Sequence, residues 1–392
     1  MTGTRNWLAL LPLISAMALS ALMLRRAWIA RNGGREVSLG DIAWMVPQIV
    51  LLLLVAAFAS GGSLEPDVGH LEIGAYSLVL FVLGSLVLLR WRLADALTRL
   101  SFKMSSLVRI LLALVTLVFV SFASAWMVDF AWMESIGGIQ LQYFVLTAML
   151  FLVVSAALFF VGQRTGALVT VVPLCAAGFG IAQYFVVLFK GTPIMPMDLL
   201  SLNTAGAIAG GYDFVLTSNM VTVLCVCAFS LCILSFMRPG APHESRKVRV
   251  GVAVASELVG FMLMIGLVSF FNGEKLEERL DYNYDRWMPI TTYNALGFVP
   301  AFIEVAQDFE IPEPPEYKKQ DVEALIADLA AQFDATMNTT PERLAAQAQF
   351  DELKPAVIGI MNETFADLSI YEPIRAAGYE GPVAYNSLTG VL

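Results

Sequence analysis

The sequence predicts an α-helical polytopic membrane bundle of about eight spans, followed by the start of an α/β domain. Hydrophobic residues make up 58% of the 392 residues and charged residues only 15%, with a mean hydropathy of +0.71, outside the range of soluble domains. Nearly all of this hydrophobicity lies in the first two-thirds of the chain. A short apolar run near the C-terminal end, closed by polar residues, indicates the strand of a second kind of domain.

Eight apolar runs are each long enough to cross about 30 Å of hydrocarbon as a helix. Short polar connections separate them. Arg25 and Arg26 directly follow the first run and resist export, so a retained helix is favoured there over a cleaved signal peptide. The runs are residues 7–24, 42–60, 73–89, 110–128, 144–161, 167–189, 220–237 and 251–271, and together they make residues 1–271 a membrane domain.

The charges of the connections alternate along the chain. Basic residues follow the first, third, fifth and seventh runs, and acidic residues follow the second, fourth and sixth. Because basic connections stay in the cytoplasm, this pattern predicts a multi-pass plasma-membrane protein whose N-terminus and long C-terminal segment are both extracellular. The basic set is Arg25, Arg26, Arg31, Arg35, Arg90, Arg92, Arg99, Lys103, Arg109, Arg164, Arg238, Arg246, Lys247 and Arg249, and the acidic set is Glu65, Asp67, Glu72, Asp129, Glu134, Asp198 and Asp213.

The net charge of −9 arises mainly from residues 272–392, which are rich in Asp and Glu. An acidic segment of this kind argues against nucleic acid as a partner, while membrane lipids are expected partners of the spans. The four cysteines, Cys175, Cys225, Cys227 and Cys232, all fall inside predicted spans. We interpret them as small apolar packing residues rather than disulfide partners or metal ligands.

The connection after the sixth run, residues 190–213, is longer than a helical hairpin needs. Pro193 and Pro196 restrict its backbone, and Lys190 stands at its start. Two compatible interpretations are an interfacial loop that packs over the bundle and a platform beneath an exterior domain. Lys190 would either meet a phosphate head group or extend its charge to the membrane surface.

Residues 272–353 are predicted to form an extracellular stalk and linker helices. The segment 311–319 is rich in proline and charge, which is typical of a stiff, extended spacer. Apolar residues recur with a helical period over 321–333, with Asp321 as the expected N-cap. A second helix is expected to begin at Thr340-Pro341, because proline is favoured at the first helical position.

Residues 354–392 contain the predicted strand. The apolar run 357–361 suits a central strand of an α/β sheet, and Asn362 and Glu363 follow at its C-terminal end, where open α/β sheets bind ligands. A carboxylate in that position can bind a divalent metal that activates a nucleophile or holds a phosphate. The alternative, from these residues alone, is a solvated Glu363 beside a helix that Thr364 caps.

Several segments, in the right order, resemble the lipoteichoic acid synthase family of the alkaline phosphatase/sulfatase superfamily. The run 355–368, Pro-Ala-Val-Ile-Gly-Ile-Met-Asn-Glu-Thr-Phe-Ala-Asp-Leu, is similar to the opening of that family's extracellular domain. Residues 294–302, with Gly297-Phe298, look like its juxtamembrane segment, and 314–329 is similar to its linker helix. The loop 191–199, Gly-Thr-Pro-Ile-Met-Pro-Met-Asp-Leu, looks like a loop in the membrane part of some members.

The resemblance implies an extracellular phosphoglycerol transferase, or a related sulfatase-type hydrolase, anchored in the membrane for cell-envelope polymer synthesis. Such enzymes use a Thr nucleophile and Mn²⁺ or Mg²⁺ to take the head group of a phosphatidylglycerol-like lipid and pass it to a glycolipid or polymer acceptor. By the same resemblance Glu363 is the first metal ligand. Asn362, Lys190 and Asp198 are candidates for supporting that ligand or contacting the lipid substrate.

The family's nucleophilic Thr and its later Asp and His ligands are expected beyond Leu392. Residues 354–392 would then be the N-terminal fragment of a sulfatase-like catalytic domain, and this chain alone would be inactive. Thr389 lacks the Gly-rich approach of the family's nucleophile and is disfavoured in that role.

Two other functions compete with this one. Glu65-Pro66-Asp67, in the first acidic connection, is the kind of acidic pair used by glycosyltransferases that act on lipid-linked sugars, although that function leaves the predicted strand unexplained. A transporter is disfavoured because the spans lack paired charges and repeats. A non-catalytic membrane scaffold is the third alternative.

Overall fold

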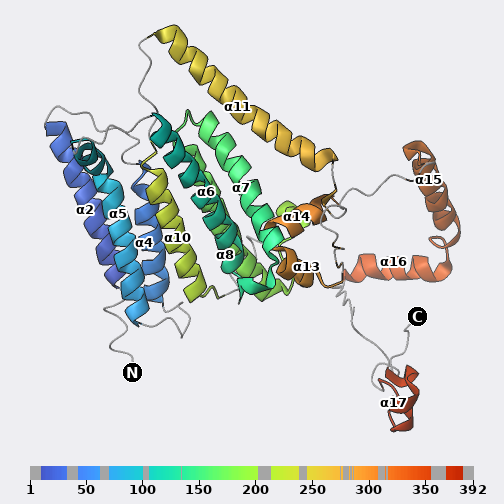
Figure 1. Cartoon of the computed structure of the whole chain (residues 1–392). Coiled ribbons are helices and arrows are strands. Elements are labelled where there is room, and N and C mark those ends of the chain that lie inside the picture. Colours follow the sequence, from blue (N-terminus) through green and yellow to red (C-terminus); the bar gives the residue numbers. More distant parts are fainter. Residues whose placement is uncertain are drawn as a thin grey trace. The chain divides into compact units, whose positions relative to one another are not determined.

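The fold was obtained as a computed structural model of the whole chain (Figure 1). The chain divides into two compact units, Met1–Ile311 and Pro312–Leu392, and each is described by itself. The structure describes residues 10–32, 43–61, 70–99, 106–133, 135–201, 213–237, 245–273, 275–276, 282, 285, 287–307, 314, 317–354 and 368–382. Within these residues the regular elements are helices, without a strand, and the predicted strand at 357–361 lies outside them.

Apolar helices dominate the first unit, and each coincides with one of the predicted runs. They are α2 (Leu10–Asn32), α4 (Val46–Gly61), α5 (His70–Arg99), α6 (Ser106–Phe130), α7 (Leu141–Val161), α8 (Val171–Lys190), α10 (Ser218–Leu234) and α11 (Arg246–Gly273). Their exposed surfaces are largely apolar, as lipid-facing surfaces are. The predicted helical membrane bundle is therefore confirmed.

Among the described residues, six helices are long and apolar enough to cross a membrane, namely α2, α5, α6, α7, α8 with the 3₁₀ turn before it, and α11. The other two are apolar but have only 16 residues in α4 and 17 in α10. At 1.5 Å per residue they extend about 24–26 Å, less than the roughly 30 Å of a hydrocarbon core. Eight full spans therefore stay a prediction.

Two helices extend past the predicted spans into the charged residues that follow. Arg25, Arg26 and Arg31 lie inside α2 rather than in the connection after it, and Arg90 lies inside α5. Arginine is a good helix former, so the hydrogen-bonded helix continues past the point where the apolar run ends. Asp129 was likewise expected in a connection, whereas it lies in the last turn of α6 and is buried.

Consecutive helices run in opposite directions, which separates the two sets of connections (Figure 1). The C-terminal ends of α2, α5, α7 and α10 lie at one end of the bundle, with Arg31, Arg164 and Arg246 near it. We call this the basic end. The C-terminal ends of α4, α6 and α8 lie at the other end, with Asp129 and Asp198, which we call the acidic end.

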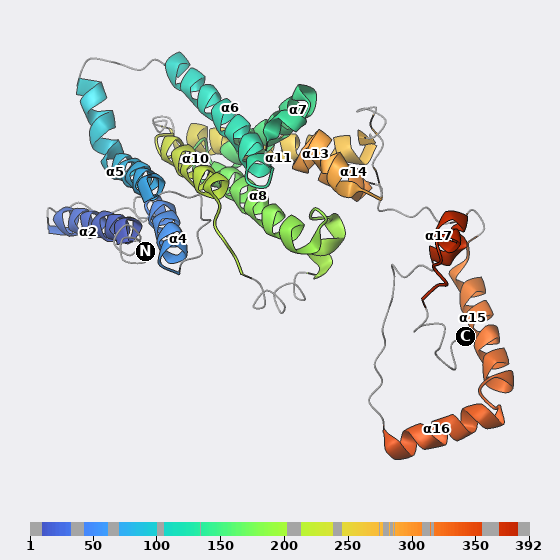
Figure 2. The same ribbon diagram turned by 90° about the horizontal axis from the view of Figure 1, so that it is seen from below.

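Helix α10 lies at the centre of the unit and joins two hydrophobic cores (Figure 2). Its Cys227 packs into the core formed with α6 and α8, and its Cys232 packs into the core formed with α2, α4 and α5. The buried Gln48 of α4 donates from Nε2 to the carbonyl of Ala228 at 3.0 Å. Cys225 is partly buried and Cys175 is exposed on α8; all four cysteines are free thiols.

Close helix contacts depend on small residues. A Cβ at Gly180 of α8 would lie 2.8 Å from the carbonyl oxygen of Met127 on α6. A Cβ at Gly260 of α11 would lie 2.7 Å from the carbonyl oxygen of Ala157 on α7. Both distances are below normal contact, so glycine allows the backbones to approach, as in many membrane helix pairs.

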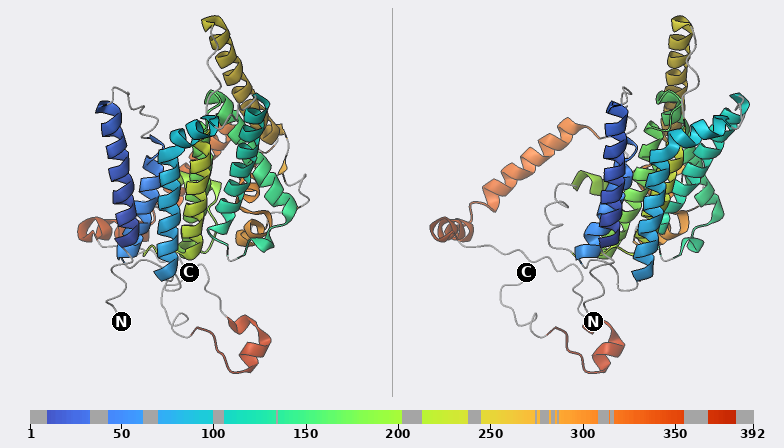
Figure 3. Two further views of the ribbon diagram at one scale, coloured as in Figure 1. Left: turned by 60° about the vertical axis from the view of Figure 1, so that its left-hand side comes forward. Right: turned by 90° about the vertical axis from the view of Figure 1, so that its left-hand side faces the viewer.

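Helix α11 packs chiefly against α7 and is otherwise exposed. Figure 3 shows it extending beyond the neighbouring helices at the basic end. After α11 the chain reaches α13 (Pro289–Leu296) and α14 (Phe298–Gln307), two short helices joined at Gly297. Tyr293, Leu296, Phe298 and Ala301 are buried in the same core as α6 and α8. We call α13 and α14 together the α13–α14 hairpin.

The second unit contains α15 (Lys319–Thr336), α16 (Pro341–Leu353), the 3₁₀ turn η5 (Leu368–Ile370) and α17 (Glu372–Ala376). The predicted second helix start is confirmed, because Thr340 Oγ1 caps α16 by accepting the Arg343 N–H at 3.3 Å. The predicted cap of the first helix was wrong. Lys318 is the N-cap of α15, and Asp321 lies in its first turn, where a carboxylate also suits the positive end of the helix.

Candidate functional site

The predicted metal ligand and its neighbour lie outside the part of the chain that the structure describes. This holds for Glu363 and Asn362, and also for Thr389 and for the Glu65–Asp67 pair of the glycosyltransferase interpretation. Within the described residues there is no group of three or more His, Cys, Asp or Glu side chains that could hold a metal ion. Lys190 and Asp198 are described, and the candidate site is built around them.

Lys190 is the last residue of α8, and the chain turns sharply after it. Gly191 ends the helix with φ +76°, a left-handed conformation that glycine adopts without strain, and its N–H donates to the Val187 carbonyl at 2.9 Å. Pro193 and Pro196 then restrict the next residues, and a 3₁₀ turn, η3 (Pro196–Ser201), follows. The turn returns the chain over the acidic end of the bundle.

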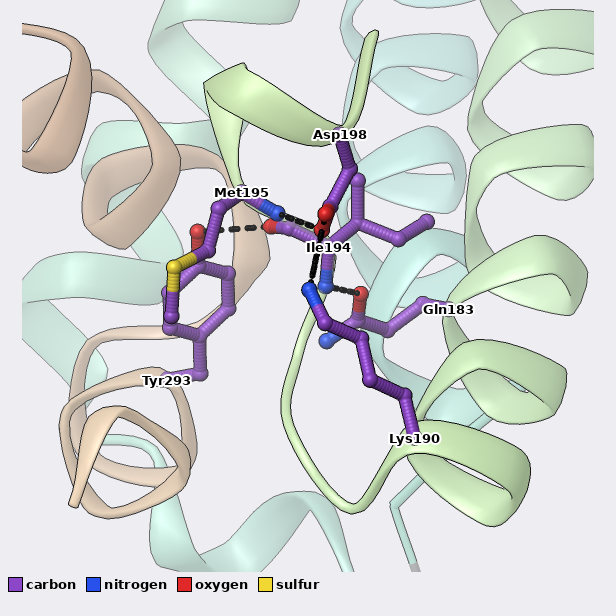
Figure 4. A network of polar contacts seen from close by, with 6 residues as sticks. All are labelled: Gln183, Lys190, Ile194, Met195, Asp198 and Tyr293. Carbon is purple, nitrogen blue, oxygen red and sulfur yellow. Dashed lines mark hydrogen bonds and ion pairs between the residues drawn. The ribbon is translucent and has the colours of Figure 1, made fainter. Parts of the chain in front are cut away.

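The structure brings Lys190 and Asp198 together. Lys190 Nζ lies 2.7 Å from Asp198 Oδ1 and 2.8 Å from Oδ2, and Oδ2 also accepts the Met195 N–H at 2.9 Å (Figure 4). The two side chains are partly exposed, so their attraction is screened by solvent and contributes little to stability. Asp198 therefore organises the loop locally, and the ammonium group of Lys190 lies at the surface.

A third residue, Ile194, is held from both sides of its peptide backbone (Figure 4). Its N–H donates to Gln183 Oε1 on α8 at 2.8 Å, and its carbonyl accepts from the Tyr293 hydroxyl on α13 at 2.9 Å. Its side chain is buried in the core shared with α6 and α13. The loop after α8 and the α13–α14 hairpin are therefore one packed structure.

The α13–α14 hairpin is also bonded to α6. Asp129 is 1% exposed, and its Oδ1 accepts the Phe298 N–H at 2.7 Å. Gly297, with φ +81°, makes this possible, because a Cβ there would lie 2.9 Å from Asp129 Oδ2. The Phe298 ring stacks with that of Phe302 and with that of Phe179 of α8, with centroids 5.6 Å and 6.1 Å away.

The C-terminal end of the hairpin is hydrogen-bonded to the last turn of α11 and to a residue that follows it. Gln307 Nε2 donates to the Phe271 carbonyl at 2.7 Å, and its Oε1 accepts the Leu276 N–H at 2.9 Å. Contacts to α6, to the loop after α8 and to the end of α11 thus fix the hairpin in three places. The hairpin is therefore held firmly at the acidic end of the bundle, and it is the last element of the first unit.

Sequence reasoning did not single out Gln183, Tyr293 or Gln307, and it gave Asp129 the wrong environment. A signal for Gln183 exists, since an amide in an otherwise apolar membrane span needs a hydrogen-bond partner. Tyr293 directly precedes the segment 294–302 that was singled out. Its partner is 99 positions away, and local sequence patterns carry no information on such a pairing.

The described arrangement combines a rigid hairpin, a proline-restricted loop and one surface ion pair. The ammonium and carboxylate of the ion pair are groups that can hydrogen-bond to a polar ligand. No protein-family model, no curated protein and no solved structure matches this chain.

Proposed function

We propose that the chain is the membrane anchor and supporting platform of an extracellular, metal-dependent phosphoglycerol transferase or related sulfatase-type hydrolase. Such an enzyme would act on the head group of a phosphatidylglycerol-like lipid and pass it to a glycolipid or polymer acceptor of the cell envelope. The family resemblance of the loop 191–199 and the segments 294–302 and 355–368 motivates the proposal.

One observation carries the proposal beyond the sequence. Two of the segments that resemble the family pack together, because Ile194 of 191–199 shares a buried core with Leu296 and Phe298 of 294–302. The Tyr293 hydroxyl, directly before 294, also donates to the Ile194 carbonyl. Residues that act together in one function are expected to be close in the fold, although a contact of this kind also serves stability. In the proposed enzyme this junction would hold the start of the C-terminal segment at a fixed place on the membrane.

In the proposed enzyme Glu363 supplies a carboxylate ligand to Mn²⁺ or Mg²⁺. Carboxylate oxygens are the hard donors that these ions prefer, and a bound divalent ion would neutralise phosphate charge. The described residues offer no competing cluster of ligands. The plasma membrane, with the acidic end outside, is the proposed location, since the basic end carries the residues that are retained in the cytoplasm.

The test uses membranes from cells that express the complete reading frame of the gene. Phosphatidylglycerol with a labelled glycerol group is supplied with Mn²⁺, and release or transfer of label is measured. We expect label transfer with the natural sequence and loss to background in Glu363→Ala, while Glu352→Ala, an exposed residue of α16, retains it. Equal transfer by both variants would exclude Glu363 as a ligand, and no transfer by the natural sequence would contradict the proposal.

The gene itself offers an independent check. The frame beyond the codon for Leu392 is expected to encode a Thr nucleophile and further Asp and His ligands. A frame without them would remove the enzymatic interpretation and favour a membrane scaffold.

A further inference from the structure

The Lys190–Asp198 pair lies at the surface, and each side chain can make a hydrogen bond beyond those within the pair. The side chains are 46% and 33% exposed. An ammonium group has three N–H donors, and among the described residues Lys190 Nζ contacts only the two oxygens of Asp198. Among the same described residues Asp198 Oδ1 accepts from Lys190 only, which leaves it a further lone pair. The pair can therefore donate one more hydrogen bond and accept one more.

The charges of this pair select against a simple anion. A phosphate that approaches Lys190 also approaches the Asp198 carboxylate, less than 3 Å from the ammonium, and the repulsion offsets much of the attraction. A ligand with its own phosphate and ammonium groups has no such conflict. Its phosphate would face Lys190 and its ammonium would face Asp198, so that unlike charges alternate around the site.

The surroundings of the pair suit a lipid rather than a free metabolite. Met197 and Leu200, in the 3₁₀ turn that carries Asp198, are exposed apolar side chains, with Leu200 80% exposed. Side chains of this kind at the end of a membrane helix would contact acyl chains. The loop is also rigid before any ligand binds, because Pro193, Pro196 and the Met195–Asp198 hydrogen bond fix it.

A second, independent observation lies beneath the pair. Gln183 is fully buried on α8, seven residues before Lys190 and so on the same side of the helix. Its Oε1 accepts the Ile194 N–H, whereas its Nε2 is a buried donor with no hydrogen-bond partner among the described residues. A buried donor left in this way is unfavourable, and because the atom is enclosed, a water molecule between it and the head group would satisfy it.

We propose that Lys190 and Asp198, supported by Gln183, form a binding site for the head group of a zwitterionic phospholipid that carries a primary ammonium group. The acyl chains would lie along Met197 and Leu200. In this role Lys190 and Asp198 are not the phosphatidylglycerol contacts that the family resemblance offers for them, and the site holds whether or not the chain belongs to such an enzyme. It makes the loop after α8 dependent on the lipid composition of the membrane.

The test measures lipid retention by the full chain purified in a neutral detergent. Phosphatidylethanolamine or phosphatidylglycerol is titrated in, and bound lipid is counted by native mass spectrometry. We expect the natural chain to bind phosphatidylethanolamine about fivefold more tightly than phosphatidylglycerol, and Lys190→Gln to abolish the preference. Lys190→Gln keeps the Asp198–Met195 bond, so the loop is retained. Lys319→Gln in α15 breaks another surface ion pair, with Glu323, and should change nothing.

Three results would overturn the proposal. The first is equal retention of phosphatidylethanolamine by the natural chain and by Lys190→Gln. The second is binding of phosphatidylglycerol as tight as that of phosphatidylethanolamine, which would mean that Asp198 does not discriminate. The third is equally tight binding of free phosphoethanolamine, which would make the site one for a soluble ligand and not for a lipid.

Discussion

Asp129 and Phe298 are 169 positions apart in the sequence, yet the Asp129 carboxylate accepts the Phe298 backbone N–H at 2.7 Å. Because Asp129 is buried, this hydrogen bond is shielded from water and satisfies a backbone donor at the start of α14. It joins the end of a membrane-spanning helix to the α13–α14 hairpin that follows the last span.

Replacement of Asp129 should loosen the hairpin in a graded way. Asp129→Ala removes the acceptor and leaves the Phe298 N–H buried without a partner, which should cost about 1–3 kcal/mol of unfolding free energy. Asp129→Asn retains an oxygen acceptor and should cost clearly less. Unfolding by sodium dodecyl sulfate in mixed micelles measures both. Equal losses in the two variants would show that the hydrogen bond does not hold the hairpin.

Gly297→Ala should also displace the hairpin. The added Cβ would lie 2.9 Å from Asp129 Oδ2, and φ +81° is unfavourable for alanine, so the expected cost is about 1–3 kcal/mol. Gly251→Ala in α11 is the matched control, because its Cβ would meet nothing within 4 Å. Faster hydrogen exchange at residues 298–302 in Gly297→Ala alone is the expected result. Unchanged exchange there would contradict it.

Tyr293→Phe should weaken the contact between the hairpin and the loop after α8. The ring is retained, but the hydroxyl that donates to the Ile194 carbonyl is lost, at a cost of about 1 kcal/mol. The effect should be local, with earlier proteolytic cleavage in the loop 191–201. Tyr371→Phe removes an exposed ring hydroxyl in the second unit and serves as the control. Cleavage at the same rate in both variants would argue against the contact.

Gly260→Ala should force α11 away from α7. The new Cβ would lie 2.6 Å from Val161 Cγ2 and 2.7 Å from the Ala157 carbonyl oxygen, and such overpacking costs about 1–3 kcal/mol. Gly266→Ala, six residues further along the same helix, has open space around its Cβ and should be neutral or slightly stabilising. Thermal unfolding in detergent compares the two. If both variants unfold alike, α11 does not pack against α7 through Gly260.

The sequence predicted the helices of the bundle because an apolar run of span length is a local signal. The helices continue past the predicted spans at Arg25 and Arg90, where charge marks the limit of the apolar region but not of the helix. The sequence indicated the loop 191–199 and the segment 294–302 separately. Their contact through Tyr293 and Ile194 could not be predicted, because it depends on how α8 and α13 pack and not on either segment alone.

The candidate site was predictable to a similar extent. Lys190 and Asp198 were named individually, but only the turn at Gly191 brings them within hydrogen-bonding distance. Asp129 was interpreted as a connection residue because it follows an apolar run. Nothing near it in sequence indicates that its carboxylate would accept the Phe298 N–H in a buried position. Glu363 and Asn362 lie outside the described residues, so their roles stay predictions.

The long separation of Asp129 from its partner has a consequence for biosynthesis. The ribosome adds about 5–20 residues per second, so roughly 8–34 seconds pass between the synthesis of Asp129 and that of Phe298. During that time the carboxylate is without its backbone donor at the end of α6. Docking of the hairpin is therefore a late step in assembly, and a chain whose synthesis stops before Phe298 would leave the Asp129 carboxylate without this backbone donor.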